Sequence, residues 1–150
     1  MSDVQLRFSH AEFAARLAKT RRSMEAKGLD LLIVSDPSNM NWLTGYDGWS
    51  FYVHQAVIVP LDGQPLWFGR KQDANGAKRT AYIAEDNILY YEDHYVQSTE
   101  RHPMDRLSEI LASRGWDRLV IGVEMDNYWF SAAAFASLQH HLPNAHFSYA

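Results

Sequence analysis

A short apolar run at residues 29–34 limits the folds open to this chain more than any other segment does. Its apolar residues follow one another without alternation, which is the pattern of a strand buried on both faces of a sheet. Such a sheet needs a layer of helices on each side, so the run favours an α/β architecture. The strand cannot continue through Pro37, because proline has no backbone N–H for the ladder.

The segment before this strand has the pattern of a helix with a defined start and end. Ser9 and Glu12 have the spacing of a capping box, and Phe8 and Phe13 have that of a hydrophobic staple. Gly28 is a favoured residue just beyond a helix end. We therefore predict a helix between Ser9 and Gly28, whose inner face is formed by Phe13, Leu17, Thr20 and Met24.

The rest of the chain alternates between short strands and helices. Turn residues at 60–63 predict a hairpin, Pro103 suits the first position of a helix, and Asp126 or Asn127 suits the cap of the last helix. This order predicts an α/β domain with a mixed central sheet and helices on both faces. The expected strands are 53–59, 64–68, 87–91, 119–123 and 145–149, and the expected helices are 39–43, 74–82, 103–114 and 127–139.

Length and composition indicate one ordinary globular domain and exclude several kinds of function. The chain has 150 residues, a net charge of −4 and no cysteine. Without cysteine there is neither a disulfide framework nor a thiolate metal site. The acidic balance argues against a nucleic acid as partner, and no apolar run reaches the roughly 20 residues of a membrane span. We therefore expect a cytoplasmic protein that binds neither nucleic acid nor membrane.

No sequence signature of a catalytic centre occurs in the chain. Phosphate loops, dinucleotide-binding glycines, the zinc motif HExxH and the nucleophile motif GxSxG are all missing. The seven histidines do not share a helix face, and the adjacent His140 and His141 point about 100° apart. Adjacent acids at 85–86 and 92–93 are placed like solvated loop residues. The sequence thus predicts no catalytic residue and no metal ligand in this chain.

The segment at residues 39–54 is the most informative for function. Large aromatic side chains crowd into its second half, in a glycine-containing loop that follows the buried strand. Aromatic faces hold small polar rings and cations well, and they are costly when merely exposed. We expect a place in the domain's own core for Trp42 and Tyr46, and contact with a substrate or another molecule for Trp49, Phe51 and Tyr52.

Two polar loops, at 69–76 and 95–105, are weaker candidates for a functional site. Loops on a rigid scaffold do carry binding residues. A polar stretch of this kind is more often a plain connection, so both loops rank below the aromatic segment.

Four segments in a fixed order carry a family likeness: Phe8-Ser9-x-x-Glu12-Phe13-x-x-Arg16-Leu17, Gly28-Leu29-Asp30-x-Leu32, Asp36-Pro37-x-Asn39-x-x-Trp42-Leu43-Thr44-Gly45-Tyr46 and Gly122-Val123-Glu124. With this order and spacing the chain resembles the N-terminal domains of creatinase, prolidase and Xaa-Pro aminopeptidase. The resemblance implies a three-layer, ribonuclease H-like α/β domain over residues 1–150. It also implies a C-terminal catalytic domain of the pita-bread type beyond residue 150, where the chain stops without a closing element.

Within that family the chain looks most like the members that hydrolyse ectoine, over residues 42–55, 72–76 and 93–105. This resemblance implies hydrolysis of a C–N bond that opens the cyclic amidine ectoine to an acetylated diaminobutyrate. Catalytic residues are then expected in the absent domain. A divalent Mn, Co or Zn ion is expected there if the enzyme works like the peptidase members, and no metal if it works like creatinase.

The family likeness also implies a role for the aromatic segment. These N-terminal domains help to form a homodimer and cover the active site of the partner subunit. In creatinases a Phe and an Arg two residues later reach that site, and these positions hold Phe51 and Val53 here. Loss of the Arg weakens creatine as a substrate. Phe51 is then the best candidate for substrate contact, followed by Trp49, Tyr52 and His54.

Two other functions stay open on the sequence alone. One is the N-terminal domain of an Xaa-Pro dipeptidase or aminopeptidase, whose aromatic segment receives the N-terminal side chain of a peptide. The other is a stand-alone module that binds a small molecule, because the Asp36-Pro37 turn follows a buried strand. The missing phosphate loop and the missing acidic cluster at the strand ends count against this second alternative.

Overall fold

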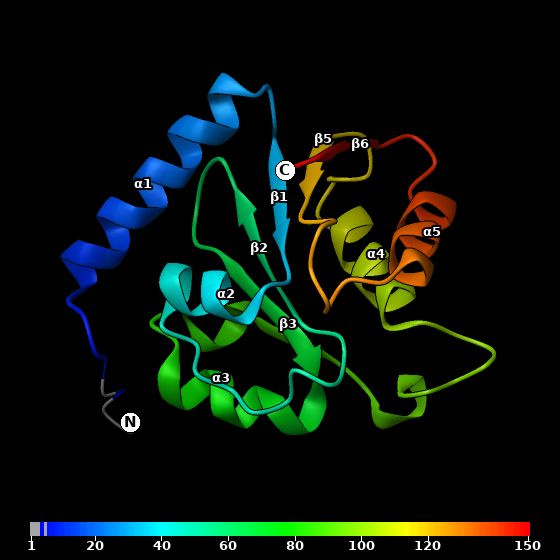
Figure 1. The fold of residues 1–150 in the computed structure, drawn as a ribbon, viewed down its shortest axis with the longest axis horizontal. Helices are drawn as coiled ribbons and strands as arrows, with labels where there is room; N and C mark the ends of the chain where they lie inside the picture. The colour runs from blue at the N-terminus through cyan, green and yellow to red at the C-terminus, as the bar shows by residue number, and fades with distance from the viewer. Residues whose placement is uncertain (1–3, 5) are drawn as a thin grey trace.

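A six-stranded mixed sheet forms the middle of the molecule (Figure 1). The computed structural model describes residues 4 and 6–150. The strand order is β4-β3-β2-β1-β5-β6; β2 pairs antiparallel with both of its neighbours, and the other pairs are parallel. The strands are β1 (Leu31–Val34), β2 (Ala56–Pro60), β3 (Leu66–Arg70), β4 (Ile88–Tyr91), β5 (Val120–Val123) and β6 (His146–Tyr149).

Helices cover both faces of this sheet, as the sequence predicts (Figure 1). One face packs against α4 and α5 around a core that includes Leu107 and Leu138, and the other packs against α1, α2 and α3 around Trp67. Within the residues described, no helix is long and apolar enough to cross a membrane. The helices are α1 (His10–Ala26), α2 (Pro37–Thr44), α3 (Ala74–Thr80), α4 (Pro103–Ser113) and α5 (Ala132–His141), with 3-10 turns η1 (Lys71–Asp73), η2 (Glu85–Asn87) and η3 (Asp93–Tyr95).

The central strands are apolar on both faces, which explains the run without alternation. In β1, Leu31 and Ile33 lie in the core beneath α4 and α5, while Val34 lies in the opposite core. In β2, Ile58 enters the first core and Val57 the second. Strands of this kind are stable between two helical layers. The predicted three-layer α/β architecture is therefore confirmed.

At the start of the first helix the Ser9 cap and the Phe8–Phe13 contact form as predicted, but Glu12 has a different partner. Ser9 Oγ accepts a hydrogen bond from the Glu12 N–H at 3.2 Å. Phe8 packs edge to face on Phe13, with 6.2 Å between the ring centroids. The Glu12 carboxylate accepts from Arg16 Nε at 2.9 Å instead of completing the capping box. An ion pair one turn along the helix is an alternative use of the same acid.

The last helix begins later than the sequence predicts. Ser131 caps α5, so the expected cap at Asp126 or Asn127 is wrong. The Asn127 side chain instead donates to Ser35 Oγ at 2.9 Å and accepts from the Trp129 N–H at 2.8 Å. An Asn side chain that binds the backbone two residues ahead stabilises a turn, and this turn delays the helix.

Candidate functional site

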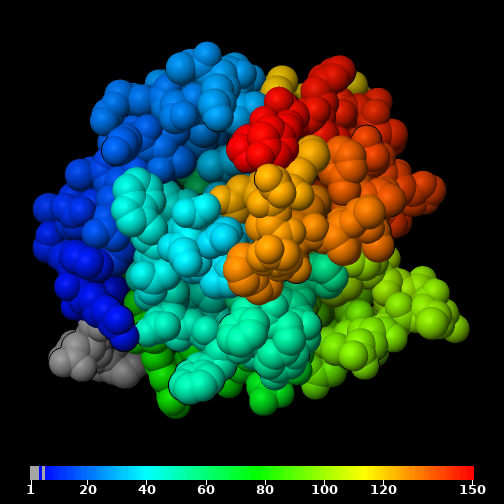
Figure 2. All heavy atoms as spheres, in the orientation of Figure 1, coloured from blue at the N-terminus to red at the C-terminus, as the bar shows by residue number. Residues whose placement is uncertain are grey.

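The residues between α2 and β2, 45–55, form the aromatic loop. Gly45 fixes its start as the C-cap of α2, with a φ of +82° that suits glycine. The loop lies at the surface, where Figure 2 shows it in teal. The predicted strand start at residue 53 is wrong, because residues 51–53 form a turn closed by a hydrogen bond from the Val53 N–H to Ser50 O at 3.1 Å.

The aromatic loop buries its first ring. Tyr46 is enclosed 5.3 Å from the ring of Trp67, and its hydroxyl donates to Gln55 Oε1 at 2.8 Å. Burial raises the Tyr46 pKa, so the hydroxyl keeps its proton and stays a donor. The prediction that Tyr46 fills the core is confirmed. The same prediction for Trp42 is wrong, because its ring is 38% exposed beneath the guanidinium of Arg16.

Three further aromatic side chains of the loop project into solvent. Trp49 is 88% exposed, Tyr52 71% and Phe51 55%. The rings of Phe51 and Tyr52 meet edge to face with 6.4 Å between centroids. Rings of this size leave much apolar surface in water, and grouped exposed rings indicate a contact surface. Their contact with another molecule stays a prediction.

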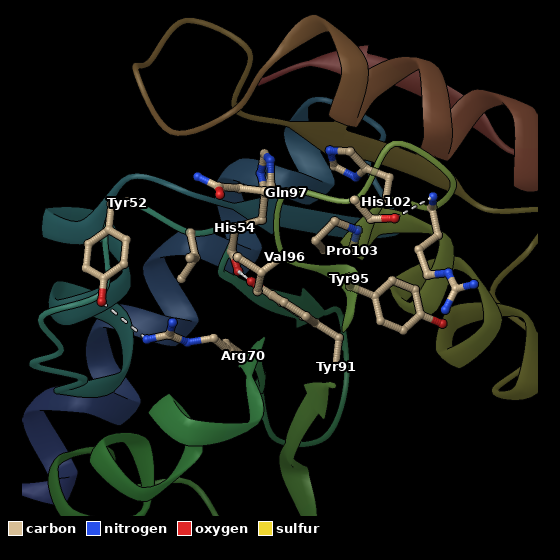
Figure 3. Close-up of a pocket in the computed structure, with 12 residues that line it drawn as sticks. Tyr52, His54, Arg70, Tyr91, Tyr95, Val96, Gln97, His102 and Pro103 are labelled. Carbon is tan, nitrogen blue, oxygen red and sulfur yellow. Dashed lines mark hydrogen bonds between the residues drawn. The ribbon is translucent and has the colours of Figure 1, made fainter. Parts of the chain in front are cut away.

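A polar network ties the exposed half of the loop to the end of β3. Ser50 is buried and its hydroxyl donates to Asp73 Oδ1. Asp73 Oδ2 accepts from Arg70 Nε at 3.0 Å, and Arg70 Nη2 donates to Tyr52 Oη at 3.3 Å (Figure 3). The hydrogen bond to Asp73 raises the Arg70 pKa, and the Arg70 guanidinium lowers that of Tyr52. The network thus holds Tyr52 against a rigid strand end.

Tyr52 and Arg70 of this network border a pocket of about 320 Å³ (Figure 3). Its other walls come from Tyr91 at the end of β4 and from residues 95–98 and 101–103, which lead into the start of α4. The volume is that of a site for a small molecule. Of the four residues predicted to contact substrate, the structure brings two to this pocket and leaves two on the loop outside it: Tyr52 and His54 line it, and Trp49 and Phe51 do not.

The pocket floor follows the register of the sheet. Ala56 pairs with Phe68 in antiparallel register, and Arg70 pairs with Tyr91 in parallel register. Continuing the first register by two residues places His54 opposite Arg70. The Tyr91 hydroxyl donates to the backbone oxygen of His54 at 2.7 Å. The start of β2 therefore meets the ends of β3 and β4 at one edge, because β2 runs antiparallel to β3 and β4 runs parallel to β3.

Two neutral imidazoles lie side by side at the pocket. The ring centroids of His54 and His102 are 4.5 Å apart. Burial and, secondly, the neighbouring His102 lower the His54 pKa to about 4. Burial also lowers the His102 pKa, and its Nδ1 accepts from the Met104 N–H at 3.0 Å. At neutral pH both rings are therefore uncharged, and the remaining proton of His102 lies on Nε2.

Two residues of the polar loops, which are weaker candidates by sequence, line the pocket. Arg70 comes from the polar loop at 69–76, and Gln97 from the one at 95–105. Gln97 has a φ of +52°, uncommon for a residue with a side chain, and its sequence carries no sign of it. Arg70 does carry a signal, since charged residues that close a buried strand often lie at the binding edge of an α/β sheet.

The histidines and acids that the structure describes do not assemble a metal centre. Across residues 4 and 6–150, no three of these side chains gather in a way that could hold an ion. The pair His54 and His102 lacks a third ligand. The described residues therefore do not fit a divalent cation.

The comparison with known families decides the classification. The model of the creatinase/prolidase N-terminal domain matches residues 16–150. The chain belongs to this family. It is 56% identical over 149 residues to ectoine hydrolase of Halomonas elongata, covering 99% of this chain and 37% of that protein. It is 40% identical over 143 residues to the uncharacterized hydrolase/peptidase y4tM of Sinorhizobium fredii, covering 95% of this chain and 36% of that one. The chain thus spans little more than a third of these relatives.

Solved structures of the same family share the fold. A creatinase-type domain of a dipeptidase from Streptococcus thermophilus superposes with a TM-score of 0.70 at 23% identity, covering 89% of this chain and 91% of that one. A proline dipeptidase from Streptococcus agalactiae gives 0.70 at 21% identity, covering 91% and 93%. Dipeptidase PepE from Mycobacterium ulcerans gives 0.67 at 20% identity, covering 91% and 34%. At these identities the likeness concerns the fold alone.

Proposed function

We propose that the chain is the non-catalytic N-terminal domain of a homodimeric hydrolase that opens the ring of ectoine at a C–N bond, giving N-acetyl-diaminobutyrate. The 56% identity to ectoine hydrolase over nearly the whole chain supports this proposal. Because the chain spans 37% of that protein, a separate catalytic domain is expected to complete the enzyme. The observation that carries the role of this domain is the aromatic loop, which is fixed at its base and exposed beyond it.

A fixed loop with exposed rings is suited to close over a second surface. Tyr46 and Ser50 hold its backbone, so little conformational freedom remains to be lost on binding. Trp49 and Phe51 then exclude water from the site that they cover, and their faces attract a cationic amidine ring. In this proposal the covered site belongs to the partner subunit, and Phe51 is the principal substrate contact.

The bond-breaking chemistry is assigned to the further domain. This chain supplies positioning and exclusion of water, which raise the rate without a reacting group of their own. A divalent Mn, Co or Zn ion in the further domain is part of the peptidase-like version of the proposal, and the creatinase-like version has none. A cytoplasmic location belongs to the proposal as well, supported by the absence of cysteine.

The deciding experiment follows ectoine by proton NMR with the longest native form of this protein, purified with and without added divalent metal. We expect the ring signals of ectoine to be replaced by those of an acetylated diamino acid. Activity only with metal supports the peptidase-like version, and equal activity under both conditions supports the creatinase-like one. Intact ectoine under both conditions would refute the proposed substrate.

The same assay separates the other candidate functions. Hydrolysis of Xaa-Pro dipeptides in place of ectoine would assign the chain to a peptidase, whose aromatic loop receives the peptide's first side chain. A third outcome is tight binding of a small molecule with no turnover of either substrate. The pocket of about 320 Å³ would then mark a stand-alone binding module.

A further inference from the structure

The pocket beside Tyr52 combines cationic and apolar walls. Its lining includes the guanidinium groups of Arg70 and Arg101 and, among the residues that the structure describes, no Asp or Glu. Tyr91 and Val96 supply aromatic and aliphatic surface. A small cavity of this composition is suited to a compact ligand that carries an anionic group on a ring.

Arg70 is the better placed of the two cations. Its side chain is only 14% exposed, and Nε and Nη2 are occupied by Asp73 and Tyr52. Nη1 donates no hydrogen bond within residues 4 and 6–150. A guanidinium held along one edge presents its remaining N–H groups in a fixed direction, so binding costs little side-chain entropy. Figure 3 shows Arg70 below the pocket, pointing toward Tyr52.

Arg101 has other partners and a looser setting. Its side chain is 42% exposed and lies 3.6 Å from the carboxylate of Glu100. Its guanidinium also lies over the ring of Tyr95, 5.9 Å from the centroid. A solvated cation with these contacts contributes little binding free energy. Arg101 is therefore expected to contribute less to an anion site than Arg70 does.

The counter-ion of Arg70 does not block the pocket. Both oxygens of Asp73 are engaged, one by the Ser50 hydroxyl and one by Arg70 Nε. Asp73 is also absent from the pocket lining. The carboxylate therefore orients the guanidinium from behind, and an incoming anion meets the opposite edge.

We propose that Arg70 binds the carboxylate of the small-molecule substrate, with the substrate ring beside Tyr52, whose own ring meets that of Phe51 edge to face. This inference rests on the proposed function, because ectoine carries a carboxylate on its amidine ring. It also gives the pocket the cation that Val53 does not supply. Val53 lines the same pocket as Arg70, so the charge enters from the end of β3 instead of from the aromatic loop.

The test compares ectoine with its decarboxylated analogue, methyl-tetrahydropyrimidine, which keeps the amidine ring. Affinity for the longest native form of the protein is read from KM where a ligand is hydrolysed and by calorimetry where it is not. We expect the wild-type protein to prefer ectoine, and Arg70→Met to weaken ectoine about 10- to 100-fold, the value of a charge-assisted hydrogen bond. The same substitution should change the analogue less than about threefold.

Two further variants separate recognition from loss of structure. Arg70→Lys keeps the charge but not the planar fork, so its loss for ectoine should lie between those of the wild type and Arg70→Met. Arg106→Met on α4, which pairs with Glu109 and lies outside the pocket lining, should change both ligands less than about threefold. Thermal unfolding of each variant shows whether it is folded. Equal weakening of ectoine and analogue by Arg70→Met, or none, would overturn the inference.

The outcomes also distinguish this inference from the proposed activity. If ectoine binds more tightly than the analogue through Arg70 but is not hydrolysed, the carboxylate site stands and the ectoine hydrolase function fails. If ectoine is hydrolysed and Arg70→Met leaves its preference over the analogue intact, the function stands and the site is wrong. Failure of ectoine to bind at all counts against both.

Discussion

A Cβ atom placed on Gly48 would lie 1.9 Å from the hydroxyl oxygen of Tyr46. The ring cannot retreat without cost, because its hydroxyl is bonded to Gln55 and its face packs beside Trp67. The backbone at Gly48 therefore sits directly on a buried side chain, and this close approach sets the path of the aromatic loop.

We expect Gly48→Ala to lower the free energy of unfolding by about 1–3 kcal/mol, since a methyl group there forces a packed ring to move. Urea unfolding of the two proteins measures the difference. Gly76→Ala in α3 is the control, because a Cβ there meets nothing within 4 Å. That substitution should stabilise the helix by about 0.5–1 kcal/mol. Equal destabilisation by both would show that Gly48 has no special role.

Ser50→Ala removes the hydroxyl that joins the aromatic loop to Asp73. The Asp73 carboxylate keeps Arg70 but loses a buried donor, so we expect a loss of about 1–2 kcal/mol in the free energy of unfolding. Backbone amides of the loop should exchange with deuterium faster, while those of β3 stay protected. Ser38→Ala, at an exposed position of α2, should change the free energy of unfolding by no more than about 0.5 kcal/mol. Unchanged exchange in the loop would contradict the assigned anchor.

Phe51→Ala tests the exposed half of the loop. The side chain is 55% exposed, so stability should stay within about 0.5 kcal/mol of the wild type. In the longest native form of the protein, kcat/KM for ectoine should fall at least about tenfold, because a ring that contacts substrate is lost. Tyr90→Ala, an exposed aromatic on the outer strand β4, should leave kcat/KM unchanged. Similar losses for both variants would remove Phe51 from the substrate site.

His54 makes stability depend on pH in a definite direction. Its pKa is about 4 in the folded protein, below the value of 6.5 for a free imidazole, so the unfolded chain takes up the proton first. The stability that the neutral ring contributes is complete above pH 6.5 and is lost as the pH falls toward 4. Between pH 7 and pH 4.5 the loss should be roughly 2 kcal/mol.

The matching experiment compares urea unfolding at pH 7 and pH 4.5 for the wild type and His54→Gln. Between these two pH values the variant should lose about 2 kcal/mol less of its free energy of unfolding than the wild type does. His140→Gln, at an exposed position of α5, serves as the control and should keep the wild-type pH effect. If His54→Gln and the wild type lose the same stability on acidification, the ring is not the group responsible.

Most elements of the fold are predictable because their signals are local. Pro103 starts α4 as its N1 residue, and Gly28 and Gly115 follow helices with φ values of +67° and +75°. Asn127 shows where local signals fail, since the same side chain caps a helix or closes a turn. Its contact with Ser35, 92 residues away, is invisible in a short window of sequence.

The pocket is less predictable than the fold, because sheet register assembles it. His54, Arg70 and Tyr91 are distant in sequence and meet only through the pairing of β2, β3 and β4. Residue type indicated Tyr52 and the family resemblance added His54, while Arg70 looked like one charge in a polar loop. The prediction for Trp42 is wrong for a related reason. Its ring packs beneath the guanidinium of Arg16 on another helix, a contact that the local sequence does not show.

The aromatic loop has an inward and an outward set of side chains, linked through the hydrogen bond that Tyr52 accepts from Arg70. Tyr46, Ser50 and Gln55 turn inward and carry the hydrogen bonds that hold the loop, while positions 49, 51 and 52 are exposed. Mutations in the outward set meet few neighbours, so they are expected to be almost neutral for folding. Ligand preference can therefore change at positions 49, 51 and 52, in evolution or in a combinatorial library, without loss of folding. Selection for a folded protein acts instead on Tyr46, Ser50 and Gln55.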